Sequence, residues 1–339
     1  MTTSEPIRVG IIGAGAMARH HIRTMLGRDD TDLVAVCEPS EAAFTMTAAE
    51  FTNRGLAVPA SEPDWRRFID RFAPTLDAVV IITPHVFHAA QATACLEAGL
   101  DVLLEKPMVM DGAEAKALIA TRDRTGRLLV VGFPGSLSPQ VRTAARLVAS
   151  GEVGAILNVD AVVWQDWQRN TAGTWRQDPA VSGGGFLFDT GAHMLNTVAD
   201  IAGEDVGELT AWLEDDGDAV DMRAAVMARL ASGALVTMNA CGRAIPSMGS
   251  EIRVFCEHAT IRTGIWGERL EIQREGSKRL ASVRSVATRS VWEQFLAVRN
   301  GREKNPSPPE VGLRMARLWD AIRESSARGG AVVRPALAA

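Results

Sequence analysis

A glycine-rich turn between a short apolar run and a helical stretch constrains the fold of this chain most strongly. The β-branched run Ile7–Ile12 predicts a buried parallel strand, and residues 19–26 predict a helix. Between them stands Gly13-x-Gly15-x-x-Ala18, the pattern typical of dinucleotide-binding folds when a strand precedes it and a helix follows. Gly13 permits the tight turn, Gly15 lets the backbone approach a pyrophosphate, and Ala18 allows the helix to pack closely on the strand.

The start of this helix and the end of the next predicted strand favour NAD as the cofactor. The backbone N–H groups of Ala16 and Met17, together with the positive end of the helix dipole, suit the phosphates. The next strand ends in Glu38, whose carboxylate can accept hydrogen bonds from the adenosine ribose. Neither Lys nor Arg stands between Arg28 and Arg54 to neutralise a 2′-phosphate. We therefore expect NAD rather than NADP.

Strands and helices alternate up to about residue 134, which predicts an α/β domain with a doubly wound parallel sheet. Ligands bind such sheets beyond the carboxyl ends of the strands. We therefore expect further cofactor contacts from residues that follow two of these strands. They are Thr83, Pro84, His88, Glu105 and Lys106.

The pattern changes beyond residue 134, where predicted strands are separated by turns such as Asp216-Gly217 and Ser232-Gly233. Such turns are typical of antiparallel hairpins. They predict an α+β second domain, which ends in an amphipathic helix at about residues 310–327. We expect a Rossmann domain over residues 1–134 and a substrate-binding domain over residues 135–339.

Composition excludes several other classes of protein. The net charge of −5 gives no reason to expect nucleic acid or an anionic membrane as a partner. No apolar run is long enough for a membrane helix, and the first strand leaves no room for a secretory signal. The four cysteines are scattered without C-x-x-C spacing, so we expect neither disulfides nor a metal site. A cytoplasmic location is the expectation.

A second glycine-rich turn, Gly183-Gly184-Gly185, precedes an acid and an imidazole. Asp189 and His193 share one face if a helix begins near Asp189. A carboxylate can orient an imidazole and favour its protonated form, which produces a base that works near neutral pH. The same spacing also occurs at an ordinary capped helix start. Because the chain contains no Tyr, proton transfer in a hydride-transfer enzyme would fall to His or Lys.

Taken together, these motifs resemble the glucose–fructose oxidoreductase / inositol dehydrogenase / MocA (Gfo/Idh/MocA) family. The resemblance rests on the first glycine turn, on Glu105-Lys106-Pro107 and on the stretch from Gly183 to His193, in matching order along the chain. It implies an NAD(P)-dependent dehydrogenase in which Lys106, Asp189 and His193 surround the reacting hydroxyl. It also implies a second domain with an open, mostly antiparallel sheet that mediates oligomerisation, so we expect a homodimer or homotetramer formed through that sheet.

The chain departs from the family pattern at Asn196, where the family usually carries an Asp. We expect Asn196 to contact the substrate, together with Lys106, Asp189 and His193. Trp175 and Arg176 are further candidates, because an indole ring can stack on the apolar face of a sugar and a guanidinium can donate to hydroxyls. Whether Trp164, Trp167 and Arg243 also line the pocket stays open.

These residues suit a cyclic sugar or polyol that is oxidised at a secondary hydroxyl. Monosaccharides and inositols rank first, sugar acids second and nucleotide sugars third, because no cluster of basic residues accompanies the motifs. Two alternatives remain. One is NAD-assisted glycoside cleavage without net oxidation, and the other is a sensor that binds the dinucleotide without turnover.

Overall fold

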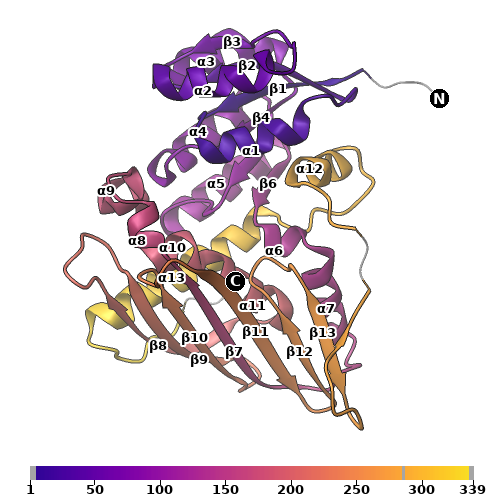
Figure 1. Cartoon of the computed structure of the whole chain (residues 1–339), viewed down its shortest axis with the longest axis vertical. Coiled ribbons are helices and arrows are strands. Elements are labelled where there is room, and N and C mark those ends of the chain that lie inside the picture. Colours follow the sequence, from indigo (N-terminus) through magenta and orange to yellow (C-terminus); the bar gives the residue numbers. More distant parts are fainter. Residues whose placement is uncertain (1–4, 285–286, 336–339) are drawn as a thin grey trace. The chain divides into compact units, whose positions relative to one another are not determined.

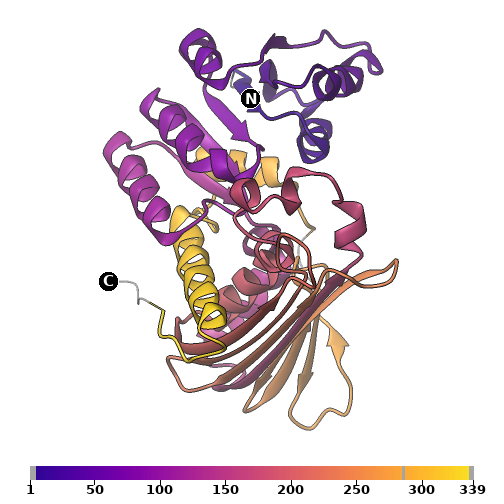
Figure 2. The same cartoon turned by 90° about the vertical axis from the view of Figure 1, so that its left-hand side faces the viewer.

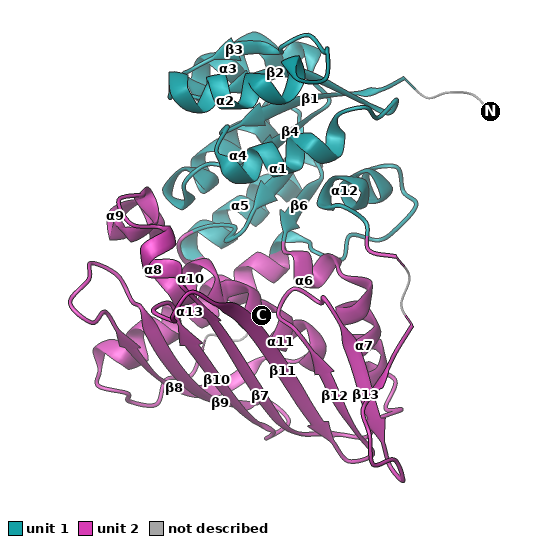
Figure 3. Cartoon of the chain, in the orientation of Figure 1, with its two compact units in different colours: residues 1–109, 113–132, 289–309 teal, residues 110–112, 133–288, 310–339 magenta. Residues whose placement is uncertain are grey.

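The computed structural model describes residues 5–284 and 287–335, and the chain divides into two compact units. Unit 1 comprises residues 1–109, 113–132 and 289–309, and unit 2 comprises residues 110–112, 133–288 and 310–339 (Figure 3). Residues 289–309 lie beyond the expected boundary at residue 134 and yet belong to unit 1.

Unit 1 contains a six-stranded sheet with the order β3-β2-β1-β4-β5-β6 (Figure 1). Its strands are β1 (Ile7–Ile12), β2 (Thr31–Cys37), β3 (Ala60–Glu62), β4 (Ala78–Ile81), β5 (Asp101–Glu105) and β6 (Leu129–Gly132). All neighbouring strands pair in parallel, which confirms the expected doubly wound sheet. The strand order reverses at β1, and such a reversal is where ligands bind open α/β sheets.

The helices of unit 1 connect these strands. They are α1 (Ala16–Met25), α2 (Glu41–Thr52), α3 (Trp65–Phe72), α4 (His88–Glu97) and most of α5 (Gly112–Thr125), with α12 (Val291–Arg299) returning from far along the chain. Three-residue 3₁₀ turns precede β4 (Ala73–Thr75) and α4 (His85–Phe87).

Helix α12 was not expected from the sequence. Its Trp292 is fully buried and donates its indole N–H to the hydroxyl of Thr31 at 2.8 Å. Arg299 pairs with Asp101 at 2.9 Å. Contacts with β2 and β5 therefore attach this late segment to unit 1.

Unit 2 contains an eight-stranded sheet with the order β14-β13-β12-β11-β7-β10-β9-β8. Its strands are β7 (Ile156–Gln165), β8 (Val206–Glu214), β9 (Arg223–Leu230), β10 (Leu235–Cys241), β11 (Met248–Cys256), β12 (Ala259–Thr263), β13 (Leu270–Arg274) and β14 (Ala281–Ser282). Within the described part of this sheet, β7 and β10 are parallel and the other neighbours are antiparallel. The mostly antiparallel sheet is therefore confirmed, although β12 and β14 were not expected.

The helices of unit 2 lie on one face of this sheet and leave the other face open (Figure 2). They are α6 (Pro134–Leu137), α7 (Pro139–Ala149), α8 (Trp167–Asn170), α9 (Pro179–Ser182), α10 (Phe186–Asp189), α11 (Gly191–Ala202) and α13 (Pro309–Ala327), with a 3₁₀ turn at Trp175–Gln177. Alternate residues of β7, including Ala161 and Val163, are buried on the helix-covered face. In the described part of the chain, no helix combines the length and the apolar character needed to cross a bilayer.

Candidate functional site

The first glycine turn has the geometry that a dinucleotide requires. Gly13 has φ +97°, and a Cβ atom there would lie 2.4 Å from the carbonyl oxygen of Ile82, so only glycine fits. A Cβ at Gly15 would meet no atom within 4 Å, which leaves open space beside the backbone. Ala16 and Met17 are exposed at the start of α1, whereas Ala18 is fully buried. The free N–H groups at this helix end therefore suit a pyrophosphate.

Glu38 is held against this turn by two backbone hydrogen bonds. Its Oε2 accepts the N–H of Ala14 at 2.7 Å, and its Oε1 accepts the N–H of Ser40 at 2.8 Å. The structure also places the guanidinium of Arg19 on the carbonyl of Ala14, at 3.1 Å. Arg19 lies outside the interval from Arg28 to Arg54, so the expectation of NAD took no account of this cation.

The residues after β4 and β5 are tied together by His88. Its ring is fully buried, with Nε2 2.9 Å from the carbonyl oxygen of Thr83 and Nδ1 2.8 Å from that of Pro107. Burial lowers the pKa of His88, although both carbonyls favour the protonated ring. Both ring nitrogens therefore face main-chain carbonyls. One of these carbonyls belongs to Thr83, the residue directly before Pro84.

Lys106 follows Glu105, a largely buried residue that was expected only as a cofactor contact. The Oε1 atom of Glu105 lies 2.7 Å from Nε2 of His21, and its Oε2 accepts the N–H of Lys106 at 3.1 Å. Burial alone would raise the pKa of Glu105, but the hydrogen bond from His21 and the charges of His21 and Lys106 lower it overall. His21 was not among the residues expected from the sequence, although its position one turn after Ala18 places it on the buried side of α1.

In unit 2 the second glycine turn is explained by a close approach of two backbones. A Cβ at Gly185 would lie 2.0 Å from the carbonyl oxygen of Asp221. The Asp221 carboxylate accepts the N–H groups of Gly185 at 2.7 Å and Leu187 at 2.9 Å, so it caps the start of α10. Burial raises the pKa of Asp221. The helix expected to begin near Asp189 thus starts earlier, at Phe186, and is interrupted at Thr190.

Asp189 lies at the end of α10 and has two donors on one oxygen. Its Oδ2 accepts the indole N–H of Trp167 at 2.9 Å and the Nε–H of Arg176 at 3.2 Å. The Arg176 guanidinium in turn lies 4.5 Å from the centre of the Trp175 ring. The structure therefore brings Asp189, Arg176 and Trp175 together. Trp167 is only 3% exposed, so it supports the carboxylate from the interior.

His193 lies on α11 between two aromatic side chains. Its ring centre is 6.2 Å from that of Phe133 and 5.8 Å from that of Trp266. Trp266 belongs to the turn between β12 and β13, which Thr197 of α11 holds by donating to the carbonyl of Ile265 at 2.7 Å. Trp266 was missed because more than seventy residues separate it from His193 in the sequence.

Asn196 belongs to a buried network rather than to an open surface. Its Nδ2 donates to the hydroxyl of Ser136 at 2.8 Å and to the carboxylate of Asp200 at 3.0 Å, and the residue is only 2% exposed. Asp200 also pairs with Arg314 of α13. The network links α6, α11 and α13.

Trp164 and Arg243, two further candidates, each have a neighbour that the structure shows. Trp164 is on the open face of the sheet, where its ring covers Gly249 so closely that a Cβ there would lie 2.3 Å from it. Arg243 pairs with Asp216 at 3.4 Å, in the hairpin between β8 and β9. Among the described residues no group of His, Cys, Asp and Glu is arranged to hold a metal ion.

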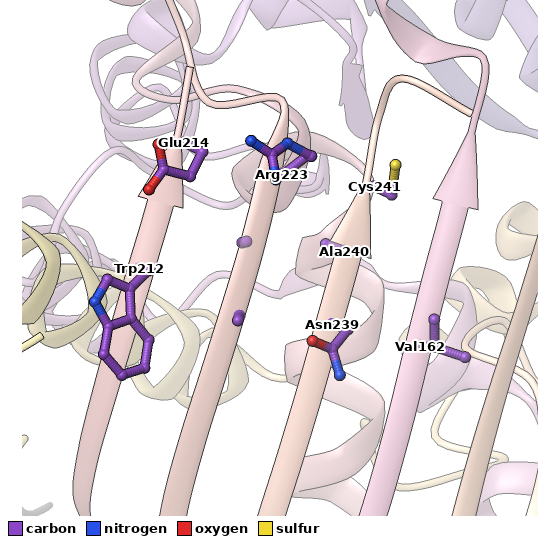
Figure 4. A pocket seen from close by; sticks show the side chains of 9 residues that line it. Val162, Trp212, Glu214, Arg223, Asn239, Ala240 and Cys241 are labelled. Atoms are coloured by element: carbon purple, nitrogen blue, oxygen red, sulfur yellow. The ribbon is translucent and has the colours of Figure 1, made fainter. Parts of the chain in front are cut away.

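A cavity of about 300 Å³ lies on the same open face (Figure 4). Its lining comes from β7, β8, β9 and β10 and includes Trp212, Glu214, Arg223, Asn239 and Cys241. None of the residues expected to act in catalysis lines it.

Comparison with known proteins assigns both units to one family. Residues 7–133 match the model described as "Oxidoreductase family, NAD-binding Rossmann fold", and residues 141–262 match the "GFO/IDH/MocA C-terminal domain". Unit 1 therefore carries an NAD-binding Rossmann fold, as the glycine turn predicts.

Two curated relatives and one solved structure illustrate the similarity. The chain is 28% identical over 212 residues to levoglucosan dehydrogenase of Pseudarthrobacter phenanthrenivorans, covering 59% of the chain and only 52% of that relative. It thus spans about half the length of this relative. It is 25% identical over 317 residues, 90% of the chain and 94% of the relative, to 4-carboxy-2-hydroxymuconate-6-semialdehyde dehydrogenase of a Sphingobium species.

The structure of levoglucosan dehydrogenase in complex with NADH and levoglucosan shares the fold. It superimposes with a TM-score of 0.82 at 22% identity, covering 98% of this chain and 100% of the other. The two matching domain models lead to one assignment: the chain belongs to the Gfo/Idh/MocA family of oxidoreductases.

Proposed function

We propose that this protein oxidises a secondary hydroxyl of a cyclic sugar or polyol, with NAD as the hydride acceptor. Two features of this family member carry the proposal. Unit 1 has a glycine turn with the geometry that a dinucleotide requires, and unit 2 has a buried Asp189 next to the helix of His193. When bound, NAD supplies the acceptor for the hydride that leaves the carbinol carbon. The hydroxyl must lose its proton in the same reaction, which yields a ketone.

We assign proton transfer to the residues of the chain. His193 is the base that accepts the hydroxyl proton, and the rings of Phe133 and Trp266 pack against its imidazole. Asp189 supports the positive charge that His193 gains. Lys106 supplies positive charge to the oxygen as it becomes alkoxide-like.

A variant series tests these roles. Lys106→Met and His193→Asn should each lower kcat by roughly a hundredfold or more, as expected for the loss of a base or of electrostatic stabilisation. Asp189→Asn should have an intermediate effect, because the imidazole stays in place. NADH affinity should survive in all three variants, since none of these residues belongs to the glycine turn. Near-normal turnover in either of the first two variants would remove that residue from the assignment.

The substrate class follows from the surroundings of His193. The half-buried Trp266 offers an aromatic surface, and Trp175 with Arg176 offers a second surface and hydrogen-bond donors. Such groups suit a ring with apolar faces and hydroxylated edges. A relative of this chain is a levoglucosan dehydrogenase, which supports a sugar-like substrate. We place Asn196 in support of α11 rather than in contact with the substrate, because its amide is engaged by Ser136 and Asp200.

A substrate screen decides between this proposal and its alternatives. Monosaccharides, inositols, sugar acids and nucleotide sugars are incubated with NAD, and both NADH and product are measured. A semialdehyde is included, because one full-length relative carries that activity in its name. We expect one NADH for each ketone formed. Product without NADH would indicate glycoside cleavage, and NADH binding without any product would indicate a sensor.

We also propose that the open sheet face forms a homodimer or homotetramer. This face carries exposed apolar side chains at Trp212, Met227 and Leu235, which is typical of a protein interface. A monomer in light scattering at micromolar concentration would contradict this proposal. The cysteines Cys37, Cys95, Cys241 and Cys256 are all free, which supports a reducing compartment such as the cytoplasm.

A further inference from the structure

A part-buried hydrogen bond joins the helix of the glycine turn to the residue before Lys106. His21 lies on α1, five residues after the exposed first residue Ala16, and Glu105 is the last residue of β5. Nε2 of His21 and Oε1 of Glu105 are 2.7 Å apart, and His21 is only 3% exposed. The two residues are 84 positions apart in the sequence, so this contact is a product of the fold.

The charge state of Glu105 gives the hydrogen bond its direction. Its lowered pKa keeps the carboxylate ionised at neutral pH, so the Nε2 atom of His21 must be the donor. A buried carboxylate is costly unless it is fully hydrogen-bonded. Here both oxygens have donors, His21 on Oε1 and the Lys106 N–H on Oε2. A Cβ atom at Gly132 on the neighbouring strand would lie 3.4 Å from Oε1, so β6 also packs closely against the carboxylate.

The backbone around Lys106 is fixed on its other side as well. The carbonyl of Pro107 lies 2.8 Å from Nδ1 of the buried His88. The N–H of Lys106 and the carbonyl of the next residue thus have buried partners, and the lysine side chain leaves the backbone between these two points. The contact of the Lys106 N–H with Glu105 continues through His21 to α1, the helix that begins at the glycine turn.

We propose that His21 and Glu105 are positioning residues that fix Lys106 relative to the dinucleotide turn. Their effect on turnover rests on the proposed function, whereas their effect on the placement of Lys106 does not. The hydrogen bond connects α1, whose first residues would face the pyrophosphate of a bound dinucleotide, with the backbone that carries the lysine. Loss of the bond should therefore impair the action of Lys106 while leaving the turn itself able to bind NADH.

Kinetics of four variants provide the first test. His21→Ala and Glu105→Gln should lower kcat by about tenfold or more, as expected when a hydrogen bond to a charged group is lost. His21→Gln should restore part of the loss, because its amide can donate to the same oxygen. The matched control is His20→Ala, which removes the neighbouring exposed imidazole of α1 and should leave kcat unchanged.

Two readouts separate positioning from a merely structural role. The Kd of NADH should stay within about twofold of wild type in His21→Ala and His21→Gln, since His21 is not among the expected cofactor contacts. In a Lys106→Met background, His21→Ala should cause no further loss of kcat, since the residue it positions is already gone. A parallel loss of NADH affinity, or a fully additive loss in the double variant, would overturn the proposal.

The final test needs no turnover. The rate at which acetic anhydride acetylates the Lys106 amine is followed by mass spectrometry in the wild type and in the same variants. We expect a change of at least about threefold in His21→Ala and Glu105→Gln, a smaller change in His21→Gln, and none in His20→Ala. Equal rates throughout would overturn the proposal whatever the kinetics. Altered labelling in a protein that turns over none of the sugars would instead retain the positioning role and refute the proposed function.

Discussion

Replacement of Glu38 by Ser should reduce the preference for NAD over NADP. The carboxylate is fixed by the N–H groups of Ala14 at 2.7 Å and Ser40 at 2.8 Å, so it cannot swing away from a 2′-phosphate without losing both bonds. Two like unit charges about 5 Å apart repel by about 3 kcal/mol at an effective dielectric constant of about 20. The Arg19 guanidinium at the Ala14 carbonyl and dissolved salt reduce this repulsion.

A net discrimination of about 2–3 kcal/mol corresponds to a kcat/KM that is roughly 30- to 150-fold higher with NAD. In Glu38→Ser this ratio should fall below about fivefold, both because the repulsion is gone and because NAD loses its ribose acceptor. Steady-state kinetics with both cofactors and one saturating substrate measure the ratio.

The matched control is Glu41→Gln, which removes an exposed negative charge from the first turn of α2. It should leave the ratio unchanged. The reasoning is refuted if the wild type uses NADP as well as NAD, or if Glu38→Ser and Glu41→Gln shift the ratio equally.

Three further predictions concern the supports of the site. Trp167→Phe keeps an aromatic ring but removes the donor to Asp189, so it should lower the free energy of unfolding by about 1.5–3 kcal/mol and kcat by about tenfold; an unchanged kcat would show that this hydrogen bond does not matter for catalysis. Gly185→Ala places a Cβ 2.0 Å from a backbone oxygen and should cost about 3 kcal/mol in urea unfolding, whereas Gly207→Ala, with its nearest atom at 3.5 Å, should cost far less; equal costs would contradict the close approach. The pKa of Glu105 is lowered in the folded protein, so the ionised carboxylate stabilises the fold fully above the unfolded-state pKa of about 4.3, and this stabilisation is lost as the pH falls through the lower folded-state pKa. On acidification the Tm of the wild type should therefore fall more than that of Glu105→Gln. Parallel curves of Tm against pH would contradict this prediction.

The parallel sheet and the first glycine turn could be predicted because their signals are local. A β-branched run, two glycines and a helical stretch stand next to one another, and the structure shows φ +97° at Gly13 as the turn requires. Helix α12 could not be placed in unit 1 in this way, because what attaches it is the contact of Trp292 with Thr31. Its start was nevertheless visible as a capping box, Ser290 and Glu293.

The candidate site shows the same difference between local and long-range information. The motifs identified Asp189 and His193, but the groups that hold them come from distant segments: Trp167 precedes Asp189 by 22 residues, and Trp266 lies in another hairpin. A pattern along the sequence also cannot show which face of a strand a side chain takes. Trp164 therefore remained a candidate until the structure placed it on the open face, over Gly249.

Hydride transfer from the carbon that bears the secondary hydroxyl can be followed with a substrate deuterated at that carbon. The protein is incubated with NAD and the best sugar or polyol from the screen, and the mass of the nucleotide is determined after turnover. We expect one deuterium in each NADH formed and one ketone for each NADH. Product that forms while the nucleotide carries no deuterium would show that the hydride does not leave this carbon, and would contradict the account.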